Sequence, residues 1–199
     1  NEISFGGKTI YERSHAAACG DIWQSNINID GTPNGYYVYT MDGATISNCY
    51  YKGANWDKNK QMSVFRADTD FNGESYAADW LLGKGKGTIV ANIFNADSKW
   101  KVYAVEGGVK TEMTRLQSTP GQDAFAVGYH KKYAVANKYN FFSKQNGYLK
   151  MNHWYSYIPK DANAVITIEA TDPFGNTYTA SSKDAVTEPF FNYAHYYGK

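Results

Sequence analysis

The stretch YYVYTMDGATISNCYY, residues 36–51, decides the fold class that we predict for this chain. Tyr and Val dominate its first positions, and such side chains are enriched in β-strands because they pack well on a pleated surface. Asp42-Gly43 follows, and this pair readily adopts the positive φ values that a two-residue hairpin turn needs. Residues 44–51 then return as a second strand. The stretch therefore predicts an antiparallel β-hairpin.

Further strand-like segments lie on both sides of this hairpin. They are residues 8–18, 61–66, 87–94, 100–105, 109–116, 165–171 and 177–181. We expect residues 87–94 and 100–105 to form a second hairpin across the loop 95–99. Residues 165–181 are expected to form the last hairpin, with Asp172 to Asn176 as its turn, because Asp, Pro, Gly and Asn are turn formers. Glu106-Gly107-Gly108 predicts a further turn, which leads into residues 109–116.

Two longer regions lack this pattern. Residues 67–86 are polar and Gly-rich, and residues 117–147 show no clean periodicity, although Asp123 to Lys138 could carry a short helix. The aromatic stretch 190–197 is expected to dock on the body of the protein. Short strands with turn signals at roughly even spacing are typical of a sandwich or a related barrel. The predicted fold class is all-β, a β-sandwich-like domain of short antiparallel strands with long irregular loops.

Charge and hydropathy limit the classes of function. The 199 residues include 20 Lys and Arg against 19 Asp and Glu, and the basic residues form no long cluster. Nucleic-acid and anionic-membrane surfaces need such clusters, so neither partner is expected. No apolar run approaches the roughly 18 residues that cross a membrane, and no membrane span is expected. No signal peptide is evident, so we expect the numbering to begin after processing or at an artificial boundary.

The chain has two cysteines, Cys19 and Cys49. Two alternatives stay open for them, one disulfide in an exported protein or two buried thiols, because two cysteines in a chain of this length form no disulfide framework.

Several ordered segments carry a resemblance to a known family. They are CGDIW (19–23), DGTPNGY (30–36), YYK (50–52) with QM (61–62), VANIF (90–94) with WKV (100–102), HW (153–154) and DPFGNTY (172–178). Together, over residues 8–182, they resemble the C-terminal domain of bacterial calcineurin-like phosphoesterases. Each segment alone is weak, whereas their order makes the set specific.

The resemblance implies a parent enzyme that is a metal-dependent phosphoesterase, a hydrolase with two divalent metals. Its metal-binding motifs are of the types D-x-H, G-D-x-x-D, G-N-H-E and G-H-x-H, and none of them occurs in this sequence. We therefore expect no catalysis and no cofactor in this piece. Residues 1–20 look like the closing strands of the phosphoesterase domain, with His15 a passenger of that boundary and not a ligand. Residues 21–199 look like a C-terminal all-β accessory domain.

The role implied for this domain is to pack on the phosphoesterase domain of the same chain and to shape substrate access. The candidate interface or substrate-proximal residues are Asp30, Pro33, Asn34, Tyr36 and Trp23. The rigid turn at Asp30 to Tyr36 could present Asn34 and backbone N–H groups toward a phosphate. The family and the composition also imply export, with a periplasmic, cell-surface or secreted location.

One local motif suggests a cation. Residues 68–73, DTDFNG, followed by Asp79, fit the spacing of a calcium loop. The oxygen ligands would come from Asp68, Asp70, Asn72 and Asp79, and Gly73 would allow the sharp turn. The alternative is an ordinary surface turn, because Asp, Asn and Gly are turn formers.

A rival function is a stand-alone carbohydrate-binding or adhesion module. Exposed aromatic rings can stack on sugars, and the candidates are Trp23, Trp56, Trp80, Trp154 and the pair Tyr196-Tyr197. The alternative is that these residues build the core or the seam with another domain. For catalysis by a serine nucleophile or for phosphate binding the sequence offers no G-x-S-x-G motif and no P-loop.

Overall fold

The computed structural model describes residues 2–20, 27–28, 30–66, 87–116, 120–121, 123, 126, 149–150 and 153–184. The elements of this part are β-strands in several small antiparallel sheets, with no barrel, so the predicted all-β class is confirmed. Among the described residues, no helix is both long and apolar enough to cross a bilayer.

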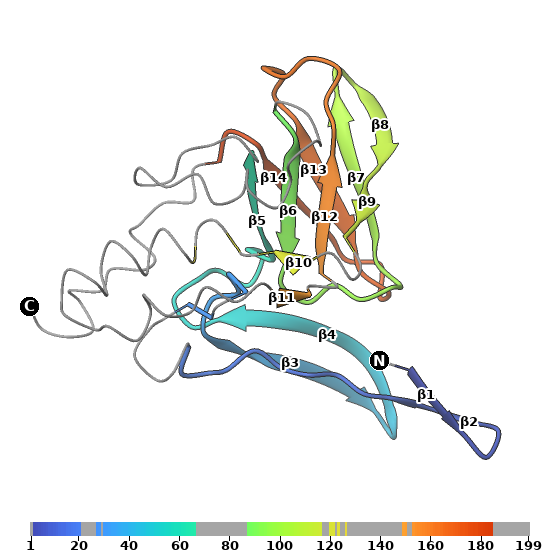
Figure 1. The fold of residues 1–199 in the computed structure, drawn as a ribbon. Coiled ribbons are helices and arrows are strands. Elements are labelled where there is room, and N and C mark those ends of the chain that lie inside the picture. The colour runs from blue at the N-terminus through green and yellow to red at the C-terminus, as the bar shows by residue number, and fades with distance from the viewer. Residues whose placement is uncertain are drawn as a thin grey trace, which may run out of the picture.

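Two four-stranded antiparallel sheets form the body (Figure 1). The first has the order β5 (Met62–Arg66), β6 (Ile89–Ile93), β12 (Trp154–Tyr157) and β9 (Thr114–Arg115). The second has the order β14 (Thr177–Ser181), β13 (Thr167–Thr171), β7 (Lys101–Glu106) and β8 (Val109–Glu112). A single hydrophobic cluster draws on both sheets, including Ile89 and Ala91 from the first and Val102 and Ile168 from the second. The body is therefore a β-sandwich.

Burial along the strands explains these layers. In β13, Ile168 and Ala170 are buried and their neighbours are only partly buried, the alternation of a strand with one face on the core. Every residue of β6 is buried. One face of β6 enters the sandwich core, and its other face, which carries Asn92, is covered by residues outside the two sheets, among them Asp30 and Asp123. β6 is thus an inner strand of its sheet. It separates the sandwich core on one face from the covering residues on the other.

The hairpin predicted at residues 36–51 is confirmed as β3 (Gly35–Asp42) and β4 (Thr45–Gly53). Its turn lies one residue later than predicted, because Asp42 still pairs with Thr45 and the two-residue loop is Gly43-Ala44. Gly43 adopts a φ of 58°, which explains the need for glycine there. A register shift between Thr40 and Met41 forms a β-bulge. The two strands form a sheet of their own, separate from the body sheets.

The hairpin predicted for residues 87–94 and 100–105 is wrong. β6 pairs with β5 and β12, whereas β7 pairs with β13 and β8. The segment between them crosses from one sheet to the other. The physical reason is that β5 and β12 occupy both edges of β6, so the chain has to leave this sheet after β6.

The remaining predicted turns and strands mostly hold. β7 and β8 are joined through Gly107 and Gly108, with φ values of 55° and 82°, and β13 and β14 form the predicted last hairpin. Of residues 8–18 only β2 (Lys8–Tyr11) is a strand, paired with β1 (Glu2–Phe5). Short strands β10 (Pro120–Gly121) and β11 (Leu149–Lys150) pair with each other. Residues 67–86, most of the predicted helix and the tail 190–197 lie outside the described residues.

Gly35 generates the first prediction. A Cβ atom at this position would lie 2.3 Å from the backbone oxygen of Lys52 and 2.8 Å from the Tyr51 hydroxyl. Gly35→Ala is therefore expected to push β3 from β4 and to lower the free energy of unfolding by about 1–3 kcal/mol, measured by urea denaturation. Gly43→Ala is the control, because nothing lies within 4 Å of that site and only backbone strain of about 1 kcal/mol is added. Equal stability of Gly35→Ala and the parent protein would contradict this account.

Candidate functional site

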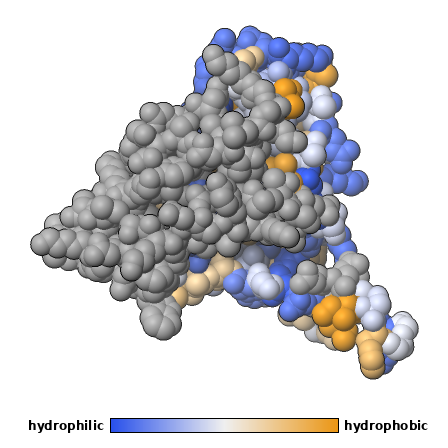
Figure 2. Space-filling view, viewed as in Figure 1, coloured by the Kyte–Doolittle hydropathy of each residue, from blue (hydrophilic) through white to orange (hydrophobic). Residues whose placement is uncertain are grey.

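An N-terminal arm, the β1–β2 hairpin of residues 2–11, projects away from the sandwich (Figure 1). Its side chains at residues 3–10 are exposed, including Ile3 at 49%, Phe5 at 81% and Ile10 at 55%. Ile3 pairs with Ile10, and Phe5 is two residues from Ile3, so all three lie on one face of the hairpin. Figure 2 shows hydrophobic surface on this hairpin. A two-stranded hairpin is marginally stable alone, and this one carries its apolar face exposed.

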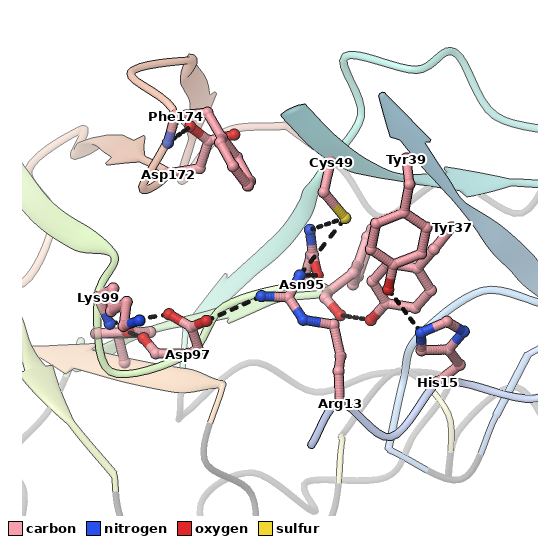
Figure 3. A network of polar contacts seen from close by, with 12 residues as sticks. Arg13, His15, Tyr37, Tyr39, Cys49, Asn95, Asp97, Lys99, Asp172 and Phe174 are labelled. Atoms are coloured by element: carbon pink, nitrogen blue, oxygen red, sulfur yellow. Dashed lines mark hydrogen bonds and ion pairs between the residues drawn. The ribbon is translucent and has the colours of Figure 1, made fainter. Parts of the chain in front are cut away.

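The arm joins the body through Arg13 (Figure 3). Its guanidinium donates hydrogen bonds to Asn95 Oδ1 and to Asp97 Oδ2, each at 3.0 Å, and to Cys49 Sγ at 3.5 Å. Asn95 and Asp97 lie in the segment that crosses between the two sheets, and Cys49 lies on β4. The Tyr155 hydroxyl in turn donates to the backbone oxygen of Asp97 at 3.2 Å. One side chain therefore links the arm, the β3–β4 hairpin and the sandwich.

His15 makes the second contact of this joint (Figure 3). Its Nε2 lies 2.7 Å from the Tyr39 hydroxyl, and its ring stacks on Tyr37 with a centroid distance of 4.1 Å. The Tyr37 hydroxyl donates to the backbone oxygen of Phe94 at 3.5 Å, and burial raises the pKa of Tyr37 well above its usual value. His15 is exposed, and these contacts hold the chain that follows the arm against β3.

The segment from Asp30 to Tyr36 is fastened to the sandwich. Asp30 Oδ1 accepts from the Thr32 N–H at 2.9 Å, and the Asp30 backbone oxygen accepts from Asn92 Nδ2 at 2.7 Å. Gly31 has a φ of 80°, and the Asp123 carboxylate occupies the space that a Cβ there would need. Asn92 Nδ2 also donates to this carboxylate, at 3.0 Å. The two acidic residues are therefore held by one buried amide.

The candidate residues of this segment differ in exposure. Pro33 is buried, and its backbone oxygen accepts a hydrogen bond from the Tyr51 hydroxyl. Asn34 is partly buried and donates to the backbone oxygen of Ala18 at 3.2 Å. Tyr36 is 55% exposed. Trp23 lies outside the described residues. The side chains that remain available to a partner are those of Tyr36 and, in part, Asn34 and Asp30.

His153, the residue before β12, lies beside the same segment. Its Nε2 lies 3.6 Å from Asp30 Oδ2, and its side chain is only 17% exposed. Burial lowers the pKa of His153, an effect that the attraction of Asp30 opposes and the charge of Arg115 reinforces. The imidazole is therefore neutral in the folded protein at neutral pH.

Two further segments that carry the family resemblance, residues 61–62 and 172–178, make contacts that hold the fold together. The Gln61 side chain accepts from the Tyr51 N–H at 3.3 Å and donates to the Lys58 backbone oxygen at 2.7 Å, so it ties β4 to the start of β5. Asp172 Oδ1 accepts from the N–H groups of Phe174 and Asn176, each at 2.9 Å, and shapes the β13–β14 turn. Asn176 Nδ2 then donates to Asn48 Oδ1 at 2.9 Å. Both segments attach the β3–β4 hairpin to the sandwich.

The cysteines are not joined to each other. Cys49 is buried and Cys19 is exposed, so neither the disulfide nor a pair of buried thiols describes them. Burial raises the pKa of the Cys49 thiol, although the Arg13 charge and three hydrogen bonds oppose the rise.

The structure describes only some of the residues of the predicted metal and glycan sites. Within the described ranges, no three His, Cys, Asp or Glu side chains gather in a group that could hold a metal. The calcium-loop residues Asp68 to Asp79 lie outside the described residues, as do Trp80, Tyr196 and Tyr197. Trp56 and Trp154 are 4% and 0% exposed and cannot stack on a sugar.

Comparison with known families decides the identification. Residues 12–178 match the family described as the C terminal of Calcineurin-like phosphoesterase. The chain belongs to this family. Neither the curated proteins nor the solved structures include a match. The match begins one residue after β2 ends, so the exposed arm lies outside the matched residues and Arg13 lies near their start.

Sequence reasoning missed the joint residues Arg13, Asn95 and Asp97. Each is an ordinary polar residue in its own segment, and no local pattern signals their contact. The only signal was indirect, since Asn95 and Asp97 lie beside the resembling segment VANIF.

The joint generates the second prediction. Arg13→Met keeps most of the aliphatic stem but removes the donors to Asn95 and Asp97. Because the ion pair is about one-third exposed, we expect the free energy of unfolding to fall by about 1 kcal/mol in urea denaturation. Arg13→Lys should be intermediate, since an ammonium keeps the charge but lacks the planar fork. Identical denaturation midpoints for all three proteins would remove Arg13 from this role.

His153 generates the third prediction. Its pKa is lower in the fold than its ordinary value near 6.5, so the unfolded chain binds a proton that the folded chain resists. The stability due to neutral His153 is complete above about pH 6.5 and is lost as the pH falls below it. Thermal melts between about pH 7.5 and about pH 5 should show this decline, and His153→Gln should flatten it. An unchanged pH profile in His153→Gln would assign the decline to other groups.

Proposed function

We propose that this chain is a non-catalytic accessory domain that packs on the phosphoesterase domain of the same polypeptide and shapes access to its substrate. The observation that carries the proposal is the arm of residues 2–11. It lies just outside the family match, it exposes Phe5 and two isoleucines on one face, and it is attached to the domain through Arg13.

The apolar face of the arm supports a permanent partner. Exposed Phe and Ile side chains each gain roughly 1.5–3 kcal/mol when fully buried, so a covering domain would stabilise the hairpin substantially. The open edges of a two-stranded sheet also offer unpaired N–H and C=O groups to a neighbouring strand. These features fit residues 1–20 as closing strands of a phosphoesterase domain.

The joint supports a fixed orientation of that partner. Arg13 and His15 hold the end of the arm on β3, β4 and the segment between the two sheets. Asn92 of the same sandwich holds the segment from Asp30 to Tyr36. A phosphoesterase domain seated on the arm would therefore meet a rigid surface, and Asn34 and Tyr36 are the residues we assign to the edge of its substrate entrance.

The chemistry would belong to the partner. Two divalent metals in such a domain activate water and stabilise the leaving oxygen of a phosphate ester, and the ligands for them are not among the residues of this site. The proposal also includes export to the periplasm, cell surface or medium.

An activity comparison is the fourth prediction and tests the proposal directly. The present chain and the polypeptide extended toward the N-terminus are assayed with Mn²⁺ on an aryl phosphate monoester and a diester. We expect hydrolysis only by the extended polypeptide. Hydrolysis by the present chain would overturn the non-catalytic role, and silence of both would overturn the enzyme inference.

The role in substrate access needs a finer readout. In the extended polypeptide, Asn34→Ala is expected to raise KM for the phosphate ester several-fold with little change in kcat, because Asn34 is assigned to the entrance and not to the reacting atoms. Val109→Ala is the control, since Val109 is exposed on β8, an edge strand of the second sheet. Unchanged kinetics and stability in Asn34→Ala would overturn the assignment of Asn34 to the substrate entrance. It would not affect the proposal that this domain packs on the phosphoesterase domain.

A further inference from the structure

Residues 27–28 and 30–33 form a turn, the covering turn, whose own hydrogen bonds are local. The Asn28 N–H donates to the backbone oxygen of Thr32 at 2.8 Å. The Thr32 N–H donates to Asp30 Oδ1 at 2.9 Å. Both bonds close within the turn, so the turn can open locally while the strands of the body stay paired, and these two amides would report the opening.

Polar contacts at its tip attach the covering turn to the sandwich. Asn92 Nδ2 on β6 donates to the Asp30 backbone oxygen at 2.7 Å. The Asp123 carboxylate lies where a Cβ atom of Gly31 would be. On the side of β12, His153 Nε2 lies 3.6 Å from Asp30 Oδ2. The closed position of the turn therefore places Asp30 directly against one titratable ring.

The surroundings of His153 suit its neutral form. Its Nε2 has no access to solvent and no hydrogen-bond partner among the described residues, and 3.6 Å to Asp30 Oδ2 is too long for a hydrogen bond. A charged ring carries an N–H on both nitrogens and would add a charge to this enclosed site. Burial lowers the pKa of His153, the attraction of Asp30 opposes this effect, and the charge of Arg115 on β9 reinforces it.

We propose that His153 is a pH-sensitive latch on the covering turn. The neutral ring keeps the turn closed, and a proton on the ring favours the open turn, in which the imidazolium reaches water. Because the proton binds the open state more tightly, the open population rises as the pH falls through about 6.5, the ordinary value for histidine. The latch belongs to this chain and does not depend on the proposed function.

Hydrogen exchange on the present chain tests the latch. The exchange rates of the Asn28 and Thr32 amides are measured by NMR at about pH 7.5 and about pH 5.5 and divided by the rates of an unstructured chain. We expect protection of both amides to fall by up to about tenfold, because one pH unit below its ordinary pKa a solvated histidine is about ten times more often charged than neutral.

Low concentrations of urea separate local opening from global unfolding. Local opening exposes little surface, so exchange at Asn28 and Thr32 should be faster than exchange in β13 and nearly independent of urea. The same protection and the same urea dependence at the turn and in β13 would overturn the latch, because the turn would then open only when the whole domain unfolds. Unchanged protection of the turn between the two pH values would overturn it as well.

Two variants assign the proton. His153→Gln keeps a polar side chain that does not titrate, and the fall in protection should disappear. Asp30→Asn keeps an oxygen for the Thr32 N–H but removes the charge that favours the imidazolium, so the fall should persist or grow. A fall that survives in His153→Gln, or that Asp30→Asn abolishes, would assign the pH response to another group and overturn the latch. If His153→Gln is too unstable for comparison, the urea dependence in the parent protein still decides.

Discussion

The burial of β6 on both faces is the constraint on which the rest of the structure depends. One face packs Ile89, Ala91 and Ile93 into the sandwich core. The other face presents Asn92, whose amide nitrogen holds Asp30 and Asp123. A buried amide that lost either acceptor would be costly, so the covering segment is fixed in position by the same strand that organises the core. The positions of the candidate interface residues in the covering segment therefore depend on this arrangement.

Polar contacts between side chains and other segments then attach the hairpins to the sandwich. Arg13 reaches Asn95 and Asp97, Gln61 reaches Tyr51, and Asn176 reaches Asn48. These bonds contribute little individually, but each is directional and each fixes the β3–β4 hairpin or the arm in one orientation. Apolar burial provides the stability of the body, and these hydrogen bonds determine where its projections point.

The features of the fold that could be predicted from the sequence are those that depend on residues close together in the chain. Residues 36–51, the Gly107-Gly108 turn and the last hairpin were predicted because strand propensity and turn chemistry act over a few residues. The β6–β7 hairpin was predicted wrongly because two adjacent strands with a short connection can either pair or cross between layers. Only the burial of β6 on both faces distinguishes these cases, and burial depends on distant residues. The same reason hides the Arg13 joint, in which Asn95 and Asp97 lie more than eighty residues from Arg13. The resemblance identified the family that the comparison confirms. It also singled out the segment from Asp30 to Tyr36, but it gave no information about the contacts of that segment.

The crossing between β6 and β7 has a consequence for how the chain folds. Because these neighbours in sequence belong to different sheets, neither sheet can be completed by zipping local hairpins together. β6 waits for β12 and β7 waits for β13, strands that come much later in the chain. Closing such long loops carries an entropic cost before the contacts form, and folding dominated by non-local pairing is slow. During synthesis, one edge of β6 therefore stays open until β12 emerges and one edge of β7 until β13 emerges, and unpaired strand edges of this kind favour aggregation.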